Sequence, residues 1–247
     1  MKKLCRISEE EVISEFLKAE FYQVEYDPDR TQFETVVYDP DLSDPEENAL
    51  RRALLFRRRG SMWRELPPDT QWWEIDFKPE ESERVNVFPR AQWRGLARGN
   101  FNSVHVAAQF RSRCARPDPS PFVLKIQALC SLMQQEGPRS TVLLIGVDEN
   151  RPVTLLEGNH RFVAALLLPR ELMLKRIRLV CGFSPLMENC CWYKTSFSSL
   201  AHYLKNRIKY IRNEEADVSR WVPLPVRGAK ASPAPIPGAA TSSAKTK

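Results

Sequence analysis

The sequence predicts an α+β fold, because strand-like and helix-like stretches alternate along the chain. The clearest strand is 141–147, a continuous apolar run. The clearest amphipathic helix is 196–212, where apolar residues recur every three or four positions. With 247 residues, the chain is long enough for one good hydrophobic core and a small second unit.

Two helices and one strand are predicted in the first 60 residues. Ser8 followed by Glu11 forms a capping box, which predicts a short amphipathic helix from that point. Residues 33–38 are predicted to form a strand. Asp44, followed by proline and two glutamates, predicts the start of a second helix. That helix is expected to end at Gly60, with three arginines in its last turn.

The remaining elements are predicted from the same signals. Further strands are expected at 71–77, 84–88, 153–156 and 177–183, and further helices between Ser120 and Gly137 and at 161–168. A turn joins 141–147 to 153–156, so these two strands are expected to form a hairpin. Four tryptophans between 63 and 93 are interpreted as core residues, with base stacking as the alternative.

Charge is distributed unevenly along the chain. Residues 1–50 contain 14 acidic and 5 basic residues, whereas residues 51–116 contain 14 basic and 7 acidic residues. This asymmetry indicates either that the two segments pack against each other or that the arginine-rich segment meets an anion. The net charge of +6 by itself argues only weakly for nucleic acid.

Several classes of protein are excluded or disfavoured. The spacing of the nine glycines excludes the common glycine-rich nucleotide loops. The apolar runs are too short to span a bilayer, so we expect no membrane partner. Three glutamates precede any apolar stretch, so we expect no secretory signal, a cytoplasmic location and reduced thiols. The six cysteines, Cys190-Cys191 included, show no paired spacing typical of zinc, so no metal site is predicted.

The corner at 157–161 is the strongest candidate for a functional site. Gly158 lets the backbone approach a ligand, and the first N–H groups of the following helix have no internal partner. Asn159 and His160 can donate hydrogen bonds, and Arg161 offers a planar group suited to phosphate oxygens. Glu157 can accept a proton or bind a metal. The structural alternative is that His160 caps its own helix and Arg161 pairs with Glu157.

This corner resembles the motif of the ParB/sulfiredoxin superfamily, a strand followed by a polar glycine-containing turn ending in arginine and a helix of the form R-x-x-A-A. The matching run is Glu157-Gly158-Asn159-His160-Arg161-Phe162-Val163-Ala164-Ala165. It is most similar to the version found in ParB-like serine kinases. The resemblance covers residues 72–183, although only 157–165 is specific. It implies a compact mixed sheet with flanking helices that binds ATP or another nucleotide, with or without Mg²⁺.

The resemblance also implies roles for residues and limits on function. Gly158, Asn159, His160 and Arg161 would hold the terminal phosphates. Sulfiredoxins have a nucleophilic cysteine where this chain has Asn159, so sulfinic acid reduction is excluded. No helix-turn-helix is recognised after residue 184, which argues against chromosome partitioning. The serine kinases use a further carboxylate, for which the candidates are Glu74, Asp76, Glu80 and Glu81.

On this basis the chain is divided into four segments. Residues 1–70 form an N-terminal α/β addition, and 71–183 form the nucleotide-binding core. Residues 184–222 form a helical segment packed on that core. Residues 223–247 are rich in proline, alanine, serine and lysine, and we expect them to be disordered.

Three functions remain open. The first is a nucleotide-dependent phosphotransferase or hydrolase, with Glu157 and His160 as catalytic residues and the turn at 158–161 as the phosphate site. The second is a DNA-associated ParB-like nuclease or nucleotide-gated DNA-binding protein that uses the arginines of 51–64 and 84–116. The third is a non-catalytic module in which the motif is structural. The sequence does not decide the oligomeric state.

Overall fold

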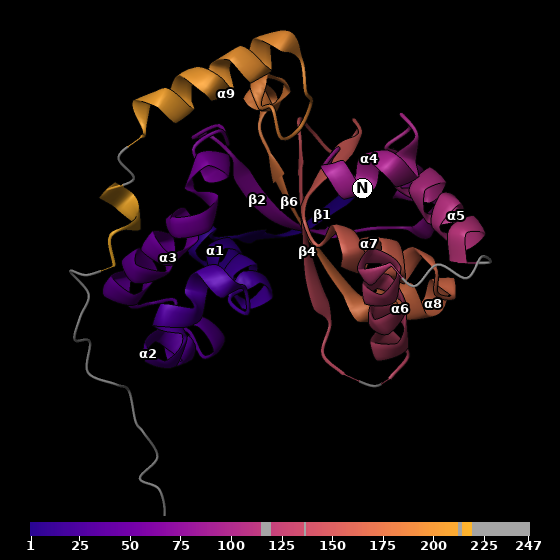
Figure 1. Cartoon of the computed structure of the whole chain (residues 1–247), viewed down its shortest axis with the longest axis horizontal. Helices are drawn as coiled ribbons and strands as arrows, with labels where there is room; N and C mark the ends of the chain where they lie inside the picture. Colours follow the sequence, from indigo (N-terminus) through magenta and orange to yellow (C-terminus); the bar gives the residue numbers. More distant parts are fainter. Residues whose placement is uncertain (115–119, 136, 212–213, 219–247) are drawn as a thin grey trace, which may run out of the picture.

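A six-stranded mixed sheet runs through the described part of the protein, with helices on both faces (Figure 1). The computed structural model describes residues 1–114, 120–135, 137–211 and 214–218. The strands are β1 (Lys2–Ile7), β2 (Gln71–Asp76), β3 (Val85–Asn86), β4 (Ser140–Gly146), β5 (Val153–Glu157) and β6 (Ile177–Phe183). The predicted α+β fold is therefore confirmed.

The strands lie in the order β1-β2-β6-β4-β5-β3. β1, β2 and β6 pair antiparallel, β6 and β4 pair parallel, and β4 and β5 form the predicted antiparallel hairpin. β3 adds to the outer edge of β5 in parallel. The first strand of the chain thus belongs to the same sheet as the strands of 71–183.

The first helical layer consists of α1 (Glu9–Glu20), α2 (Asp27–Tyr38) and α3 (Pro45–Trp63), with a short 3-10 turn at Val24–Tyr26. The side chain of Ser8 accepts a hydrogen bond from the N–H of Glu11, so α1 begins where the sequence predicts. Phe16, Leu17 and Leu54 are fully buried in the core between these helices and the sheet.

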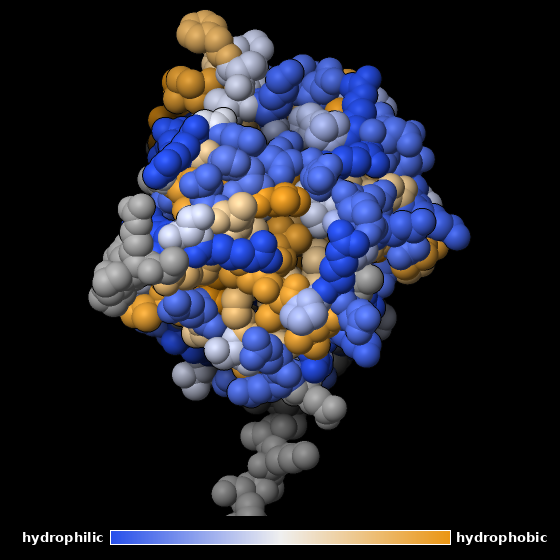
Figure 2. Space-filling view, turned by 90° about the vertical axis from the view of Figure 1, so that its right-hand side faces the viewer, coloured by the Kyte–Doolittle hydropathy of each residue, from blue (hydrophilic) through white to orange (hydrophobic). Residues whose placement is uncertain are grey.

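The second layer covers the opposite face of the sheet. It contains α4 (Ala91–Ala97), α5 (Ser103–Cys114), α6 (Pro121–Gln134), α7 (Asn159–Leu166) and α8 (Arg170–Arg176). Phe110, Ile126 and Phe162 are buried in its core. Figure 2 shows this side of the molecule, where hydrophobic side chains gather in a central hollow surrounded by hydrophilic ones.

The last helix, α9 (Phe197–Lys209), confirms the amphipathic helix predicted at 196–212. It lies at the upper edge of Figure 1, and Ser199 is its one buried residue. Short 3-10 segments occur at Pro79–Arg84, Pro185–Asn189 and Glu214–Ala216. The predicted disordered tail at 223–247 lies outside the described residues. No helix in the described ranges has both the length and the apolar character needed to cross a bilayer.

Three predictions of local structure are wrong. Residues 33–38 belong to α2, because Phe33 and Val37, one helical turn apart, are both buried on the same face. Helix α3 continues to Trp63, so Gly60 lies inside it rather than beyond its end. The strand expected at 84–88 is reduced to β3, since the chain before it forms a 3-10 turn.

The acidic N-terminal segment and the arginine-rich helix α3 neutralise each other. Arg51 is fully buried and pairs with Glu47, and Arg57 pairs with Asp29 of α2. Arg59 pairs with Glu20 at the end of α1. Of the two interpretations of the charge asymmetry, packing of the two segments against each other is therefore the one seen. These arginines are held by carboxylates rather than presented to solvent.

Candidate functional site

Gly158 forms a tight corner between β5 and α7. Its φ of +88° lies in the left-handed region, which residues with a side chain rarely adopt. A Cβ at this position would lie 3.0 Å from Cγ2 of Val142 and 3.3 Å from its Cα. Glycine is therefore required twice, by the backbone conformation and by the close approach of β4.

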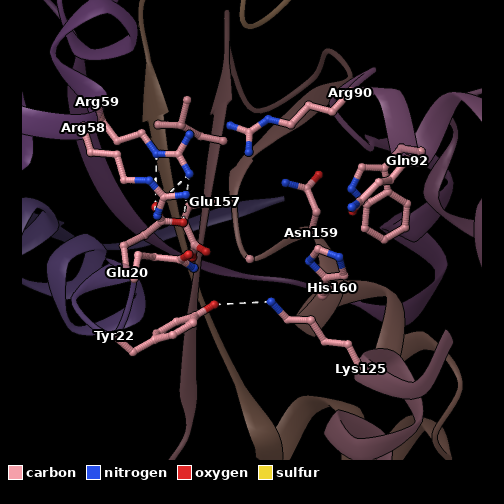
Figure 3. Close-up of a pocket in the computed structure, with 14 residues that line it drawn as sticks. Glu20, Tyr22, Arg58, Arg59, Arg90, Gln92, Lys125, Glu157, Asn159 and His160 are labelled. Atoms are coloured by element: carbon pink, nitrogen blue, oxygen red, sulfur yellow. Dashed lines mark hydrogen bonds and ion pairs between the residues drawn. The ribbon is translucent and has the colours of Figure 1, made fainter. Parts of the chain in front are cut away.

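A cavity of about 480 Å³ opens at this corner, between the two helical layers (Figure 3). Its volume falls within the usual range of small-molecule sites. One wall comes from the end of α1 and from α3, and the other comes from α4, α6 and the start of α7. The lining residues are Glu20, Tyr22, Gln23, Arg58, Arg59, Arg90, Gln92, Trp93, Lys125, Leu156, Glu157, Gly158, Asn159 and His160.

Four of the five residues predicted at the corner line this cavity, and Arg161 does not. The Arg161 guanidinium forms an ion pair with Glu157 and donates a hydrogen bond to Oγ of Ser140 at 3.0 Å. Pairing of Arg161 with Glu157 is the structural alternative considered above. In this arrangement Arg161 holds Glu157 in position and does not itself face the cavity.

Asn159 and His160 are fixed by neighbours on the α4 side. Oδ1 of Asn159 accepts a hydrogen bond from the N–H of Phe88 at 3.2 Å, and its amide nitrogen is directed toward the cavity (Figure 3). The His160 ring packs against Trp93 and Phe122, with ring centroids 5.0 and 5.4 Å away. Burial, together with the nearby charges of Lys125 and Arg90, lowers the pKa of His160 to about 4. His160 is therefore neutral at pH 7 and acts there as a hydrogen-bonding group rather than a cation.

Two cations on the same wall have no carboxylate partner within the described residues. Arg90, at the start of α4, lies over the rings of Phe88 and Trp192, each 5.8 Å from its guanidinium carbon. Burial lowers the pKa of Arg90, but arginine remains charged. Nζ of Lys125, from α6, contacts the Tyr22 hydroxyl at 3.3 Å across the cavity. Both side chains extend toward the cavity in Figure 3.

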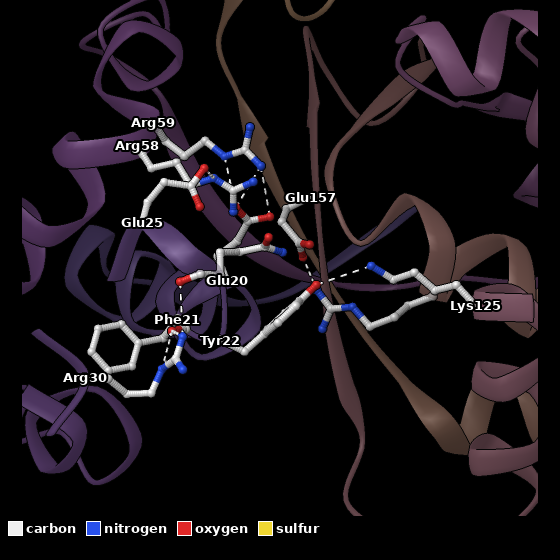
Figure 4. A network of polar contacts seen from close by, with 11 residues as sticks. Glu20, Phe21, Tyr22, Glu25, Arg30, Arg58, Arg59, Lys125 and Glu157 are labelled. Carbon is white, nitrogen blue, oxygen red and sulfur yellow. Dashed lines mark hydrogen bonds and ion pairs between the residues drawn. The ribbon is translucent and has the colours of Figure 1, made fainter. Parts of the chain in front are cut away.

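The opposite wall holds an ion-pair network (Figure 4). Glu20 receives hydrogen bonds from Arg59 at 2.7, 2.9 and 3.1 Å, and it also pairs with Arg58. Arg58 additionally contacts Glu25 at 3.2 Å. The cavity is thus lined by four cationic side chains and two carboxylates. Arg161, which does not line the cavity, further offsets the charge of Glu157.

Glu157 is the carboxylate best placed for chemistry. Burial raises its pKa, and the Arg161 guanidinium partly opposes that rise. A carboxylate with a raised pKa is a better proton acceptor. Glu157 and Glu20 already hold guanidinium groups, and the described residues contain no cluster of three or more metal-ligating side chains. The donor set therefore does not fit a Mg²⁺ ion held by the protein itself.

The other candidate carboxylates do not line the cavity. Glu74 pairs with Arg178, Glu80 with Arg170, and Glu81 with the N-terminal amine. Asp76 is exposed at the end of β2. Of the four tryptophans between 63 and 93, Trp63, Trp72 and Trp93 are buried, as expected of core residues, and Trp93 also lines the cavity. Burial also raises the pKa of Cys190 to about 11 and that of Cys191 to about 12.

Sequence reasoning missed the cations and Tyr22 as parts of one site. They come from α1, α3, α4 and α6, and only the tertiary structure brings them together. The one signal that pointed toward them was the charge asymmetry between residues 1–50 and 51–116. Comparison with models of protein families, with curated proteins and with solved structures gave no significant match.

Replacing Gly158 with alanine is expected to lower the free energy of unfolding by about 1–3 kcal/mol, because a strained backbone and a tight contact with Val142 combine. Urea denaturation measures this loss. Gly99→Ala is the matched control, since Gly99 has a similar φ of +91° but nothing within 4 Å of its Cβ position. An equal loss in both variants would contradict a role for the contact with Val142.

The lowered pKa of His160 predicts a pH dependence of stability. Between pH 6.5 and about 4 the unfolded chain binds a proton at this histidine that the folded protein does not. Stability is therefore complete above pH 6.5 and decreases as the pH falls through that window. NMR titration of the His160 ring should give a midpoint near 4, and His160→Gln should flatten this part of the stability profile. A midpoint near 6.5 would refute the buried, neutral state.

Proposed function

We propose that the protein binds a nucleotide in the Gly158 cavity and carries out phosphoryl transfer or hydrolysis there. The observation that carries the proposal is that Arg90 and Lys125, which have no carboxylate partner among the described residues, and a helix N-terminus meet at one small cavity. Phosphate chains bear several negative charges and bind well to such a combination. The resemblance of 157–165 to ParB-like serine kinases also supports a nucleotide as the ligand. The proposal includes a ParB/sulfiredoxin-like core as the fold that binds it.

Arg90 and Lys125, which pair with no carboxylate in the part of the chain that the structure describes, are the residues best suited to bind phosphate. Arg90 is partly buried, and an anionic ligand would offset the cost of burying its charge. Lys125 is exposed and would contribute a second positive charge to the same ligand. The N–H groups at the start of α7 and the amide of Asn159 lie on the same side. Neutral His160 would add a hydrogen bond without adding charge. Tyr22, 55% exposed at the rim, offers an aromatic surface for the base.

Glu157 has the position and environment of a general base. Its carboxylate faces the same cavity as the cations and has a raised pKa. In the proposed reaction it accepts the proton of the attacking hydroxyl group or water. The cations stabilise the negative charge that develops on the transferred group. Arg161 acts as a positioning residue that orients Glu157.

The DNA-associated alternative has weaker support. Most arginines of helix α3 are engaged by carboxylates of the N-terminal segment, as in the pairs Arg52–Glu9 and Arg57–Asp29. Such arginines are not free to neutralise a phosphate backbone. A cavity of this volume fits a mononucleotide rather than a duplex.

Arg90→Ala and Lys125→Ala are each expected to weaken nucleotide binding about tenfold or more, because each removes a charged hydrogen-bond donor. A thermal-shift screen of the unmodified protein with ATP, ADP, CTP and GTP, with and without Mg²⁺, identifies the nucleotide, and calorimetry measures the affinities. Arg151→Ala is the control, because Arg151 pairs with Glu188 away from the cavity. If no nucleotide stabilises the unmodified protein, the proposed function is wrong.

Glu157→Gln separates binding from catalysis. The variant is expected to retain nucleotide binding while losing about 10²-fold or more in the rate of phosphate release or transfer, because glutamine cannot accept the proton. Phosphate release from the nucleotide found in the screen measures the rate. An unchanged rate would remove Glu157 as the base. Loss of binding and rate together would assign it a structural role instead.

A further inference from the structure

The helix α9 contacts the rest of the protein through one side and leaves a row of apolar side chains exposed. On the side of α9 that faces the body, Ser199 is buried and Asn206 donates a hydrogen bond to Oε1 of Glu65 at 2.8 Å. The Tyr203 ring on this side contacts that of Trp192, with centroids 6.2 Å apart. Leu204 lies five positions after Ser199, which places it about 140° around the helix. The hydrophobic side therefore remains largely exposed, and its Leu204 and Ile208 border an open groove of about 500 Å³ whose other wall is α3.

This outward face is a continuous hydrophobic stripe. Its residues recur every three or four positions and are exposed to the following extents: Phe197 91%, Leu200 44%, Leu204 52% and Ile208 69% in α9, and Ile211 77% just after the helix ends. Scattered exposed apolar residues are normal, but five in one stripe are not. Hydrophobic side chains project at the upper end of the molecule in Figure 2, the end at which α9 lies.

Positive charge flanks the stripe on both sides. Lys205 and Lys209, one helical turn apart, lie on one flank, and Arg207 lies on the other. From Lys194 to Ile211 there are four lysine or arginine residues and no aspartate or glutamate. An apolar face bordered by lysine and arginine is typical of helices that lie in the headgroup region of a bilayer.

The charge also distinguishes among the surfaces that would cover the stripe. Pairing α9 with α9 of a second copy would bring like charges together, which is unfavourable. An anionic lipid surface satisfies both features at once, because acyl chains accept the stripe and headgroups accept the cations. The long stems of Lys205 and Lys209 can extend from the apolar region to the headgroups.

We propose that α9 docks the protein onto an anionic membrane surface. The helix lies in the plane of the interface, with the stripe at the acyl boundary and Lys205, Arg207 and Lys209 at the headgroups. The expectation of no membrane partner was based on the length of apolar runs, which bears on spanning segments only. Docking of this kind requires no spanning segment and is independent of the ligand in the Gly158 cavity.

Sedimentation of the full chain with vesicles tests this docking. We expect the protein to bind vesicles of phosphatidylcholine with phosphatidylserine and to bind little to phosphatidylcholine alone. Binding to the phosphatidylserine vesicles should weaken as the salt concentration is raised. Leu204→Glu should reduce binding at least tenfold, and Lys205→Gln/Lys209→Gln should reduce the dependence on phosphatidylserine. Val24→Glu is the matched control, because Val24 is 76% exposed but lies far from α9 in the sequence. Circular dichroism checks that each variant is folded.

Three outcomes would overturn the proposal. The first is no binding of the unmodified protein to phosphatidylserine vesicles. The second is equal loss in Leu204→Glu and Val24→Glu, which would show that α9 has no special role. The third is a dimer, measured by light scattering, that Leu204→Glu dissociates while vesicle binding is absent. That result would assign the stripe to a second copy of the chain.

Discussion

The burial of strand β4 on both faces is the constraint on which the rest of the structure depends. Val142 and Leu144 point into the core beneath α4–α8, whereas Leu143 and Ile145 point into the core beneath α1–α3. A strand that is apolar on both sides must be covered on both sides, so two helical layers are required. The cavity lies beyond the end of β5, the hairpin partner of β4, where residues from both layers meet.

The same arrangement explains the electrostatics of the cavity. Acidic residues of the first layer are adjacent to the arginines of α3, so Arg58 and Arg59 are held by Glu20. Among the described residues, no carboxylate of the second layer pairs with Arg90 or Lys125. The excess of positive charge therefore falls on the side of the cavity where α7 begins and where the helix dipole is also positive. An anion entering the cavity would meet both contributions on one wall.

The corner at Gly158 connects these two features. Its positive φ turns the chain from β5 into α7 while the backbone stays against Val142 of β4. This fixes the position of the first N–H groups of α7 relative to the sheet. Glu157, on the strand side of the corner, is held by Arg161 one turn into the helix. The corner is thus internally braced, and its polar groups do not depend on a ligand to be held in place.

Local sequence patterns were sufficient to predict the elements with strong end signals and the location of the corner. Ser8 and Asp44 cap helices that begin where predicted, because capping depends on residues only three positions apart. The strand predicted at 33–38 was wrong. The β-branched residues there favour a strand, but the burial of Phe33 and Val37 against neighbouring helices favours a helix. Three features depend on how the elements pack together: which cations share the cavity, that Arg161 turns toward Glu157, and that the stripe of α9 is exposed. These are contacts between segments distant in the sequence, and local patterns carry no information about which of them form.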